Sequence, residues 1–195
     1  MAKSESTTKR PAREAILESA MHLIAETGLH NTTQRKVAAE AGVSLAAVTY
    51  HFPRVEDLVN ATFEQAVKTY IASMGRQRDE ALAGRKSLAQ ACVDTMLDEK
   101  REPLDCALVV FSMLVESMRS ESPREESKVF LQAARDFIYP WVGNPEDAYI
   151  ASYAIIGASM SFLSLGRNET DALAEIERLF DRLGVRERIS TQTAQ

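Results

Sequence analysis

The chain has 195 residues, of which 45% are hydrophobic, and its formal net charge is −5. This composition is typical of a folded protein and excludes a chain that is disordered throughout. It also excludes a protein that binds nucleic acid over its whole surface, because such binding depends on positive charge that faces the phosphates.

Signals for membranes, secretion and catalysis are missing from the sequence. No apolar run approaches the roughly 18 to 20 residues that a membrane span needs, and the first ten residues are too polar for a secretory signal. Cys92 and Cys106 form neither a disulfide framework nor a zinc cluster, so we interpret both as core thiols, with a redox role as the alternative. His22, His30 and His51 lack metal-ligand spacing. We expect a cytoplasmic protein that is not an enzyme and has no cofactor.

Positive charge is concentrated at the beginning of the chain. Residues 1–54 contain seven basic and five acidic side chains, a balance of +2, and the remaining residues therefore sum to −7. The sequence thus predicts that any contact with nucleic acid lies at the N-terminal end.

Helix signals recur along the chain and alternating strand patterns are scarce, which predicts an all-α fold. Ser87-Leu-Ala-Gln90 and Ser122-Pro-Arg-Glu125 have the form of capping boxes, and Asn144-Pro145 opens a further helix. We predict about nine helices, over residues 11–26, 33–41, 44–51, 55–80, 87–100, 103–119, 123–141, 145–165 and 170–183.

The predicted helices fall into two domains. Residues 11–54 form a DNA-binding domain with three helices, and residues 55–185 form a body whose first helix, 55–80, connects the two. We predict flexible tails over residues 1–10 and 186–195.

The stretch from Thr32 to Phe52 has the pattern of a helix-turn-helix. Gly42 stands between two short helices, where a residue without a Cβ can adopt the left-handed conformation of a tight turn. Ser44 caps the second helix. An inward apolar face is supplied by Val37, Ala38, Val43, Val48 and Phe52. The outward face of the second helix carries small, hydroxyl-bearing and donor side chains: Leu45, Ala46, Thr49, Tyr50 and His51.

Such a helix fits a major groove, and its side chains suit different contacts. Thr49 can bond base edges, while Leu45 or Ala46 can meet thymine methyl groups. Tyr50 and His51 are better placed to donate to phosphate oxygens. The alternative interpretation is an ordinary helical turn in which these two rings only cover the core.

The start of the preceding helix offers a second anchor for DNA. Backbone amides and hydroxyls of Thr32 and Thr33 form a candidate phosphate site, and Gln34 and Arg35 lie beside it.

These residues resemble a known family. Ala38-Ala-Glu-Ala-Gly-Val-Ser44, then Val48-Thr-Tyr-His-Phe52 and Glu56-Asp-Leu58, look like the N-terminal domain of the tetracycline repressor (TetR) family, with the resemblance covering about residues 11–63. It implies an all-helical homodimer that binds a palindromic operator in double-stranded DNA, usually as a repressor, and releases it when a small molecule enters the C-terminal domain. It also implies that Thr33, Thr49, Tyr50 and His51 contact DNA.

Two positions depart from the family pattern. Thr49 stands where many members have a tyrosine, which shortens the reach toward bases, and Val55 stands where a phosphate-binding lysine is common. Arg54 is the adjacent charge that can substitute for this lysine. We therefore expect DNA shape to carry part of the specificity.

Aromatic and methionine side chains on the later helices are candidates to line an apolar ligand pocket, with core packing as the alternative. The candidates are Met96, Phe111, Met113, Glu116, Phe137, Trp141 and Tyr153. Glu116 follows the most apolar stretch of the body, so in a buried position its carboxylate would favour a cationic ligand.

The last two helices carry a candidate dimer interface. Residues 145–165 are rich in small side chains that let another helix approach closely, and residues 170–183 show a heptad-like apolar seam. The predicted interface residues are Ala154, Gly157, Ala158, Ser161, Leu173, Ile176 and Phe180, with packing inside one chain as the alternative.

The sequence thus favours a homodimeric DNA-binding regulator released by an unknown small-molecule effector. Two alternatives stay open: a DNA-binding regulator without such an effector, and a helical interaction module that has lost DNA binding.

Overall fold

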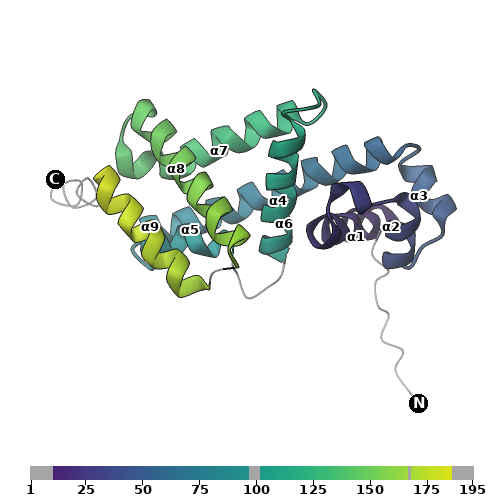
Figure 1. Ribbon diagram of the computed structural model, residues 1–195, viewed down its shortest axis with the longest axis horizontal. Helices are drawn as coiled ribbons and strands as arrows, with labels where there is room; N and C mark the ends of the chain where they lie inside the picture. Colours follow the sequence, from purple (N-terminus) through teal and green to yellow (C-terminus); the bar gives the residue numbers. More distant parts are fainter. Residues whose placement is uncertain (1–10, 97–101, 167, 186–195) are drawn as a thin grey trace, which may run out of the picture. The chain divides into compact units, whose positions relative to one another are not determined.

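The computed structural model describes residues 11–96, 102–166 and 168–185, and within these ranges the fold is built from helices (Figure 1). The prediction of an all-α protein is confirmed. The elements are α1 (Ala12–Thr27), a short 3₁₀ turn η1 (Leu29–Asn31), α2 (Gln34–Glu40), α3 (Leu45–His51), α4 (Val55–Leu82), α5 (Leu88–Asp94), α6 (Glu102–Glu116), α7 (Arg124–Val142), α8 (Pro145–Ser164) and α9 (Glu169–Leu183).

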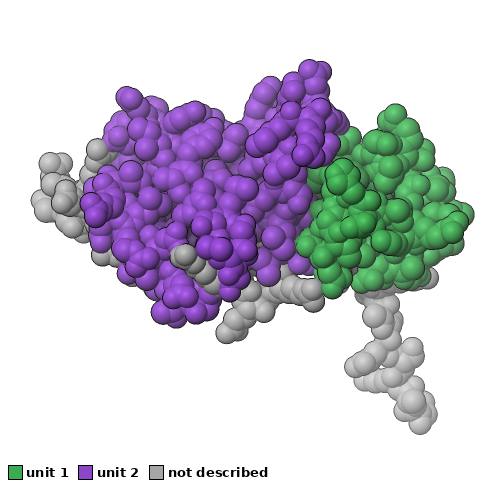
Figure 2. Space-filling model, in the orientation of Figure 1, with its two compact units in different colours: residues 1–65 green, residues 66–195 purple. Residues whose placement is uncertain are grey.

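The chain divides into two compact units, residues 1–65 and residues 66–195, which we call unit 1 and unit 2 (Figure 2). The division falls inside α4, so the predicted domain limit at residue 54 stays a prediction. Both predicted tails lie outside the described residues. No helix in the described part of the chain combines the length and apolarity needed to cross a membrane.

Unit 1 is held together by one apolar core. Ile16 of α1, Val37 of α2 and Val48 of α3 are each 0% exposed, and Phe52 and Leu58 close the same cluster. Their burial removes apolar surface from water at about 25 cal/mol per Å², which fixes the three short helices on one another. Helices as short as α2 and α3 are not stable by themselves, so this packing is what maintains them.

In unit 2 the helices pack as a chain of neighbours: α6 on α7, α7 on α8, α8 on α9, and α9 on α5. Phe130, Ile138, Phe162 and Phe180 are each at most 2% exposed and belong to the buried core. Asn144 and Asn168 cap the starts of α8 and α9 by accepting the amides of Asp147 and Asp171.

Helix α5 is shorter than predicted. It ends at Asp94, and the predicted continuation to residue 100 runs partly into residues that the structure does not describe. The Thr95 hydroxyl donates to the Cys92 carbonyl oxygen at 2.7 Å. Such a local bond competes with the helical hydrogen bonds and favours an end of the helix there.

The two predicted capping boxes differ in the structure. Ser87 accepts the Gln90 amide at 3.0 Å, but the Gln90 side chain donates to Asp94 and Glu169, so only half of the box forms. The prediction at Ser122 is wrong: the helix begins one residue later, and Pro123 occupies the N-cap position without a side-chain bond.

This difference predicts unequal effects of two serine substitutions. Ser87→Ala should lower the free energy of unfolding by about 1 kcal/mol, because it removes a helix cap, whereas Ser122→Ala should change it by less than about 0.5 kcal/mol. Urea unfolding followed by circular dichroism measures both. Equal losses in the two variants would show that the cap at Ser87 contributes nothing of its own.

Candidate nucleic-acid interface and ligand cavity

The turn between α2 and α3 follows from its glycine. Gly42 has a φ of +64°, where a side chain is strained, and the Val43 amide donates to the Ala38 carbonyl oxygen at 3.0 Å. Ser44 then starts α3 by accepting the Ala47 amide at 3.1 Å. The turn predicted at Gly42 and the cap predicted at Ser44 are both present.

Helix α3 has one buried and one open face. Val48 is 0% exposed and Phe52 is 3% exposed, so both lie in the core of unit 1. Tyr50 is 82% exposed and Leu45 is 40% exposed, and Ala46 and Thr49 are also exposed. The residues predicted to face DNA are therefore accessible in this chain, while their contacts with DNA stay predictions.

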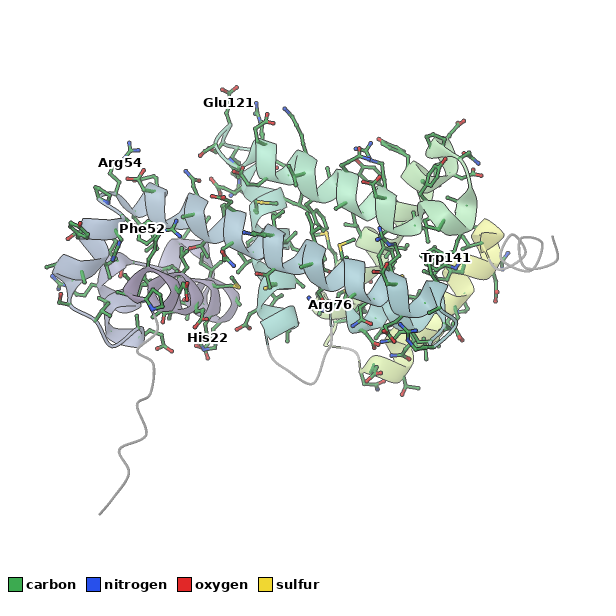
Figure 3. The ribbon with its side chains drawn as sticks, turned by 180° about the vertical axis from the view of Figure 1, so that it is seen from behind. His22, Phe52, Arg54, Arg76, Glu121 and Trp141 are labelled. Atoms are coloured by element: carbon green, nitrogen blue, oxygen red, sulfur yellow. The ribbon has the colours of Figure 1, made fainter. Side chains whose placement is uncertain are left out.

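Two ring contacts brace the end of α3. The Tyr50 and His51 rings meet edge to face, with centroids 5.2 Å apart. The Arg13 guanidinium lies 5.4 Å from the centroid of the Phe52 ring, which Figure 3 labels. The sequence had not singled out Arg13; contact with an aromatic ring far along the chain is visible only in the folded structure. Arg13 adds an exposed cation to this end of unit 1.

The Thr49 hydroxyl is engaged by its own helix. It donates to the carbonyl oxygens of Leu45 and Ala46 at 3.1 and 3.2 Å. In this rotamer its oxygen is left as an acceptor, which suits the amino groups of adenine or cytosine in a major groove.

The start of α2 differs from the predicted phosphate site. Thr32 is 4% exposed, its hydroxyl donates to the Gly28 carbonyl oxygen, and its amide donates to the Leu29 carbonyl oxygen. Neither Thr32 donor is therefore open to a phosphate. Thr33 accepts the Lys36 amide as the N-cap of α2 and is exposed.

Gln34 connects the two short helices. Its side-chain Nε2 donates to the Phe52 carbonyl oxygen at 2.5 Å and satisfies the end of α3. This bond gives Gln34 a structural role in the chain, and Arg35 is the exposed cation next to it.

Arg54 is paired with a carboxylate. Its guanidinium donates to both Asp57 oxygens, at 2.7 and 3.2 Å, and its amide donates to the same side chain at 3.1 Å. These bonds hold the pKa of the Asp57 carboxyl below its usual value. Glu56 adds a second negative charge in the first turn of α4. Arg54 points outward in Figure 3 and is paired with Asp57, so a phosphate would compete with this carboxylate for the Arg54 guanidinium. Its role in place of the lysine that many family members have at the position of Val55 stays a prediction.

Unit 2 contains a cavity of about 40 Å³. Its walls are mainly apolar and come from α4 to α8: Tyr70, Met74, Cys92, Thr95, Phe111, Phe130, Ala134, Phe137, Ser152, Ile155, Ile156 and Ser159. Of the seven predicted ligand residues, Phe111 and Phe137 line it. The sequence missed Tyr70 and Thr95, because no local pattern distinguishes a polar group that faces a cavity from one that faces solvent.

The other predicted ligand residues lie elsewhere. Met96, Met113 and Trp141 are buried in the core of unit 2 without lining the cavity. Glu116 is half-buried and Tyr153 is 42% exposed, and neither contributes to the cavity wall. The carboxylate of Glu116 is therefore not part of this cavity.

Burial suppresses ionisation inside the cavity. Loss of water raises the pKa of the Tyr70 hydroxyl from 10.0 to about 12, and a hydrogen bond with Thr95 offsets part of this rise. The same loss of water strongly raises the pKa of the Cys92 thiol. A neutral thiol is unreactive, so the interpretation of Cys92 as a core thiol agrees with its environment.

The outer surface of α8 is apolar. Ile150, Tyr153 and Met160 are 50%, 42% and 38% exposed, and Gly157 and Ser161 are open on the same helix. Ala154, Ala158 and Leu173, also predicted at a dimer interface, are half-buried.

Two predicted interface residues on α9 face inward. Ile176 and Phe180 are each 1% exposed and pack inside unit 2. Their seam serves the core of a single chain, so the dimer prediction rests on α8 and Leu173. No group of three or more His, Cys, Asp or Glu side chains in the described ranges is arranged to hold a metal ion.

The geometry defines a helix-turn-helix domain followed by a helical body, and both parts have counterparts among known proteins. Residues 16–62 match the family model for "Bacterial regulatory proteins, tetR family". The fatty acid metabolism regulator protein of Bacillus subtilis is 30% identical over 81 residues, which are 42% of this chain and 42% of that protein. The N-terminal part of the chain is thus similar to the DNA-binding domain of tetR-family regulators.

Solved structures agree over more of the chain, at the level of the fold. A member of the TetR family from Streptomyces coelicolor is 20% identical and covers 86% of this chain and 97% of its own, with a TM-score of 0.66. A protein from Saccharomonospora viridis, solved in complex with choline, is 24% identical and covers 87% of this chain and 95% of its own, with a TM-score of 0.68. The chain spans less than half the length of the curated relatives that it matches.

The buried Tyr70 hydroxyl predicts a loss of stability in alkaline solution. The unfolded chain releases this proton near pH 10 and the folded chain only near pH 12, so the free energy of unfolding should fall by about 2 kcal/mol across this interval. Urea unfolding at pH 8 to 11 should show a steeper decline for the unchanged chain than for Tyr70→Phe. Parallel declines would contradict the raised pKa.

Proposed function

We propose that this protein is a homodimeric, sequence-specific DNA-binding transcription regulator, acting as a repressor that a small-molecule effector releases from a palindromic operator. The observation that supports this most directly is the open face of α3. Val48 and Phe52 anchor that helix in the core while Leu45, Thr49 and Tyr50 project from it. The match of residues 16–62 to a family of bacterial regulatory proteins supports the same function.

The proposed reading of DNA uses few strong base contacts. Helix α3, Leu45–His51, contains neither lysine nor arginine, and its groove-facing side chains are short. Thr49 would accept from a base amino group, and Leu45 or Ala46 would contact a thymine methyl group. Sequence-dependent shape of the operator would then contribute to specificity.

Contacts with phosphates would fix the orientation of α3. Tyr50 is exposed and His51 is half-buried at the C-terminal end of α3, and Thr33 and Arg35 are exposed at the start of α2. Arg54 would contribute only after it exchanges Asp57 for a phosphate. Such contacts position a protein on DNA without reading its sequence.

The proposed dimer uses the exposed face of α8. A Cβ built on Gly157 meets nothing within 4 Å in the chain, so this position is open to another helix. Exposed Ile150 and Met160 provide the apolar area around it. Two copies of α3 would then meet successive major grooves of a palindrome, about 34 to 36 Å apart.

The proposed effector site is the cavity of unit 2. Its apolar lining with a few hydroxyl groups has the composition of a small-molecule site. The choline complex of the Saccharomonospora viridis protein shows that a protein of this fold can hold a small organic molecule. An effector that binds one spacing of the two α3 helices better than the other would shift the dimer away from DNA.

Tyr50 provides the sharpest test of DNA binding. Tyr50→Ala should weaken binding to a selected operator by roughly tenfold, through the loss of a phosphate hydrogen bond in each half-site, without lowering stability. Tyr139→Ala is the matched control, because this ring is 46% exposed on α7 in unit 2. Gel shift and fluorescence anisotropy measure the affinity.

The unchanged chain should also bind more weakly as salt rises, because phosphate contacts release counterions. An unchanged affinity in Tyr50→Ala, or a salt-independent one in the unchanged chain, would contradict the proposed interface.

Gly157 tests the proposed dimer. Gly157→Glu should yield a folded monomer, since the new side chain meets open space within the chain but blocks close approach of a second α8. Val129→Glu, at a position 55% exposed on α7, should leave the dimer intact. Sedimentation velocity separates the two states, and a dimer of unchanged strength in Gly157→Glu would exclude this face.

A second candidate function is a helical interaction module that does not bind DNA. The compensated charge of Arg54 and the acidic first turn of α4 favour it, since both weaken attraction to phosphates. Absence of any bound sequence in a selection from random DNA, for a folded dimer, would favour this candidate.

A further inference from the structure

We propose that the cavity of unit 2 selects a small uncharged molecule, no larger than one aromatic ring with a short substituent, that carries a hydroxyl or N–H donor. The proposal rests on the proposed function, because it assigns the chemical class of the effector. It departs from the sequence prediction, in which Glu116 favoured a cationic ligand.

In the described part of the chain, the cavity wall offers no charged side chain that could stabilise a bound ion. Among the described residues, no Asp, Glu, Lys, Arg or His side chain lines the cavity. Tyr70 and Cys92, the lining groups that can ionise, are kept neutral by burial. An ion that enters such a site loses its water without gaining a charged partner, a cost of several kcal/mol or more. A neutral ligand avoids this cost.

Aromatic rings of the cavity wall pack against other rings. Tyr70 and Phe130 pack against each other with centroids 5.8 Å apart. Phe137 packs in the same way against Trp141, at 6.4 Å. A cation–π contact of about 2 kcal/mol with such rings would not offset the desolvation of an ion in a site without a charged partner.

The serine and threonine hydroxyl groups of the cavity donate to backbone carbonyl oxygens. Ser152 donates to the Tyr149 carbonyl oxygen at 2.9 Å, and Ser159 donates to the Ile155 carbonyl oxygen at 2.7 Å. The Thr95 hydroxyl likewise donates to the Cys92 carbonyl oxygen at 2.7 Å. The remaining lone pairs of the serine hydroxyl oxygens accept hydrogen bonds, which selects a ligand that donates.

The volume of the cavity limits the size of the ligand. A cavity of about 40 Å³ is larger than one water needs but smaller than the roughly 150 Å³ that hosts benzene in an engineered protein. A ring therefore enters only if side chains move. Met74 is the unbranched, flexible member of the wall, and Ile155 and Ile156 are half-buried. Molecules larger than one ring exceed the volume of the cavity by still more.

Four probes with a benzene ring test the effects of ligand charge and of a hydrogen-bond donor: phenol, toluene, benzoate and benzyltrimethylammonium. Phenol should bind the full-length chain about fivefold more tightly than toluene, which has a methyl group in place of the donor. At a hundred times its Kd, phenol should raise the Tm by on the order of 5 °C. Neither ion should shift the Tm. Calorimetry and thermal unfolding, both without DNA, measure these effects.

Variants locate the binding to this cavity. Ser159→Val fills the cavity and removes an acceptor, so it should abolish the response to phenol. Ser164→Val is the matched control, because the Ser164 hydroxyl makes the same type of bond, to the Met160 carbonyl oxygen at 2.7 Å, on the exposed part of α8. If Ser159→Val fails to fold, Ser152→Ala serves instead, and it should reduce the preference for phenol over toluene.

Phenol binding that is about fivefold tighter than toluene binding, and that Ser159→Val abolishes, supports the proposal. Equal affinities for phenol and toluene overturn the requirement for a donor, and phenol binding that persists in Ser159→Val overturns the assignment to this cavity. Stabilisation by benzoate or benzyltrimethylammonium equal to that by phenol overturns it, as does the lack of a response to all four probes. Because these measurements need no operator, they fail independently of DNA binding, which the gel shift with Tyr50→Ala tests.

Discussion

The burial of Val48 and Phe52 is the constraint on which the proposed interface depends. Both side chains belong to the apolar core that also contains Ile16 and Val37. Because one face of the short helix α3 is buried in this core, its opposite face is left toward solvent. Gly42 allows the tight turn before α3 because it adopts a positive φ. The Gln34 side chain donates a hydrogen bond to the Phe52 carbonyl oxygen at the C-terminal end of α3. The position of Tyr50 in solvent is therefore a consequence of packing on the opposite side of the helix.

Helix α8 of unit 2 likewise has one inner and one outer face. Ser152, Ile155 and Ser159 face the cavity, while Ile150, Gly157 and Met160 are exposed on the outer side of the same helix. In the proposed mechanism one helix wall thus separates the effector from the partner subunit. A ligand that moves the inner face would act directly on the surface through which two copies meet, without a long path of coupled residues.

Both proposed sites offer few charged groups to a binding partner. In unit 1 the Arg54 charge is compensated by Asp57, which leaves hydroxyl groups, rings and the exposed cations Arg13 and Arg35 for DNA. In unit 2 the cavity excludes ionised groups in the described part of the chain. The proposed operator complex would rely on fit and orientation more than on charge, and the proposed effector site on shape and one hydrogen bond.

The sequence by itself determined the helical class, the order of the helices, the turn at Gly42 and the open face of α3, because periodicity, caps and glycine are local signals. Only the tertiary structure decided which groups were already engaged. It gave Thr32 and Gln34 partners inside the chain, paired Arg54 with Asp57, turned Ile176 and Phe180 inward, and placed Tyr70 and Thr95 at the cavity instead of Glu116. The physical reason is that a hydrogen bond or a cavity wall joins residues far apart in the chain, and a local pattern holds no information about such partners.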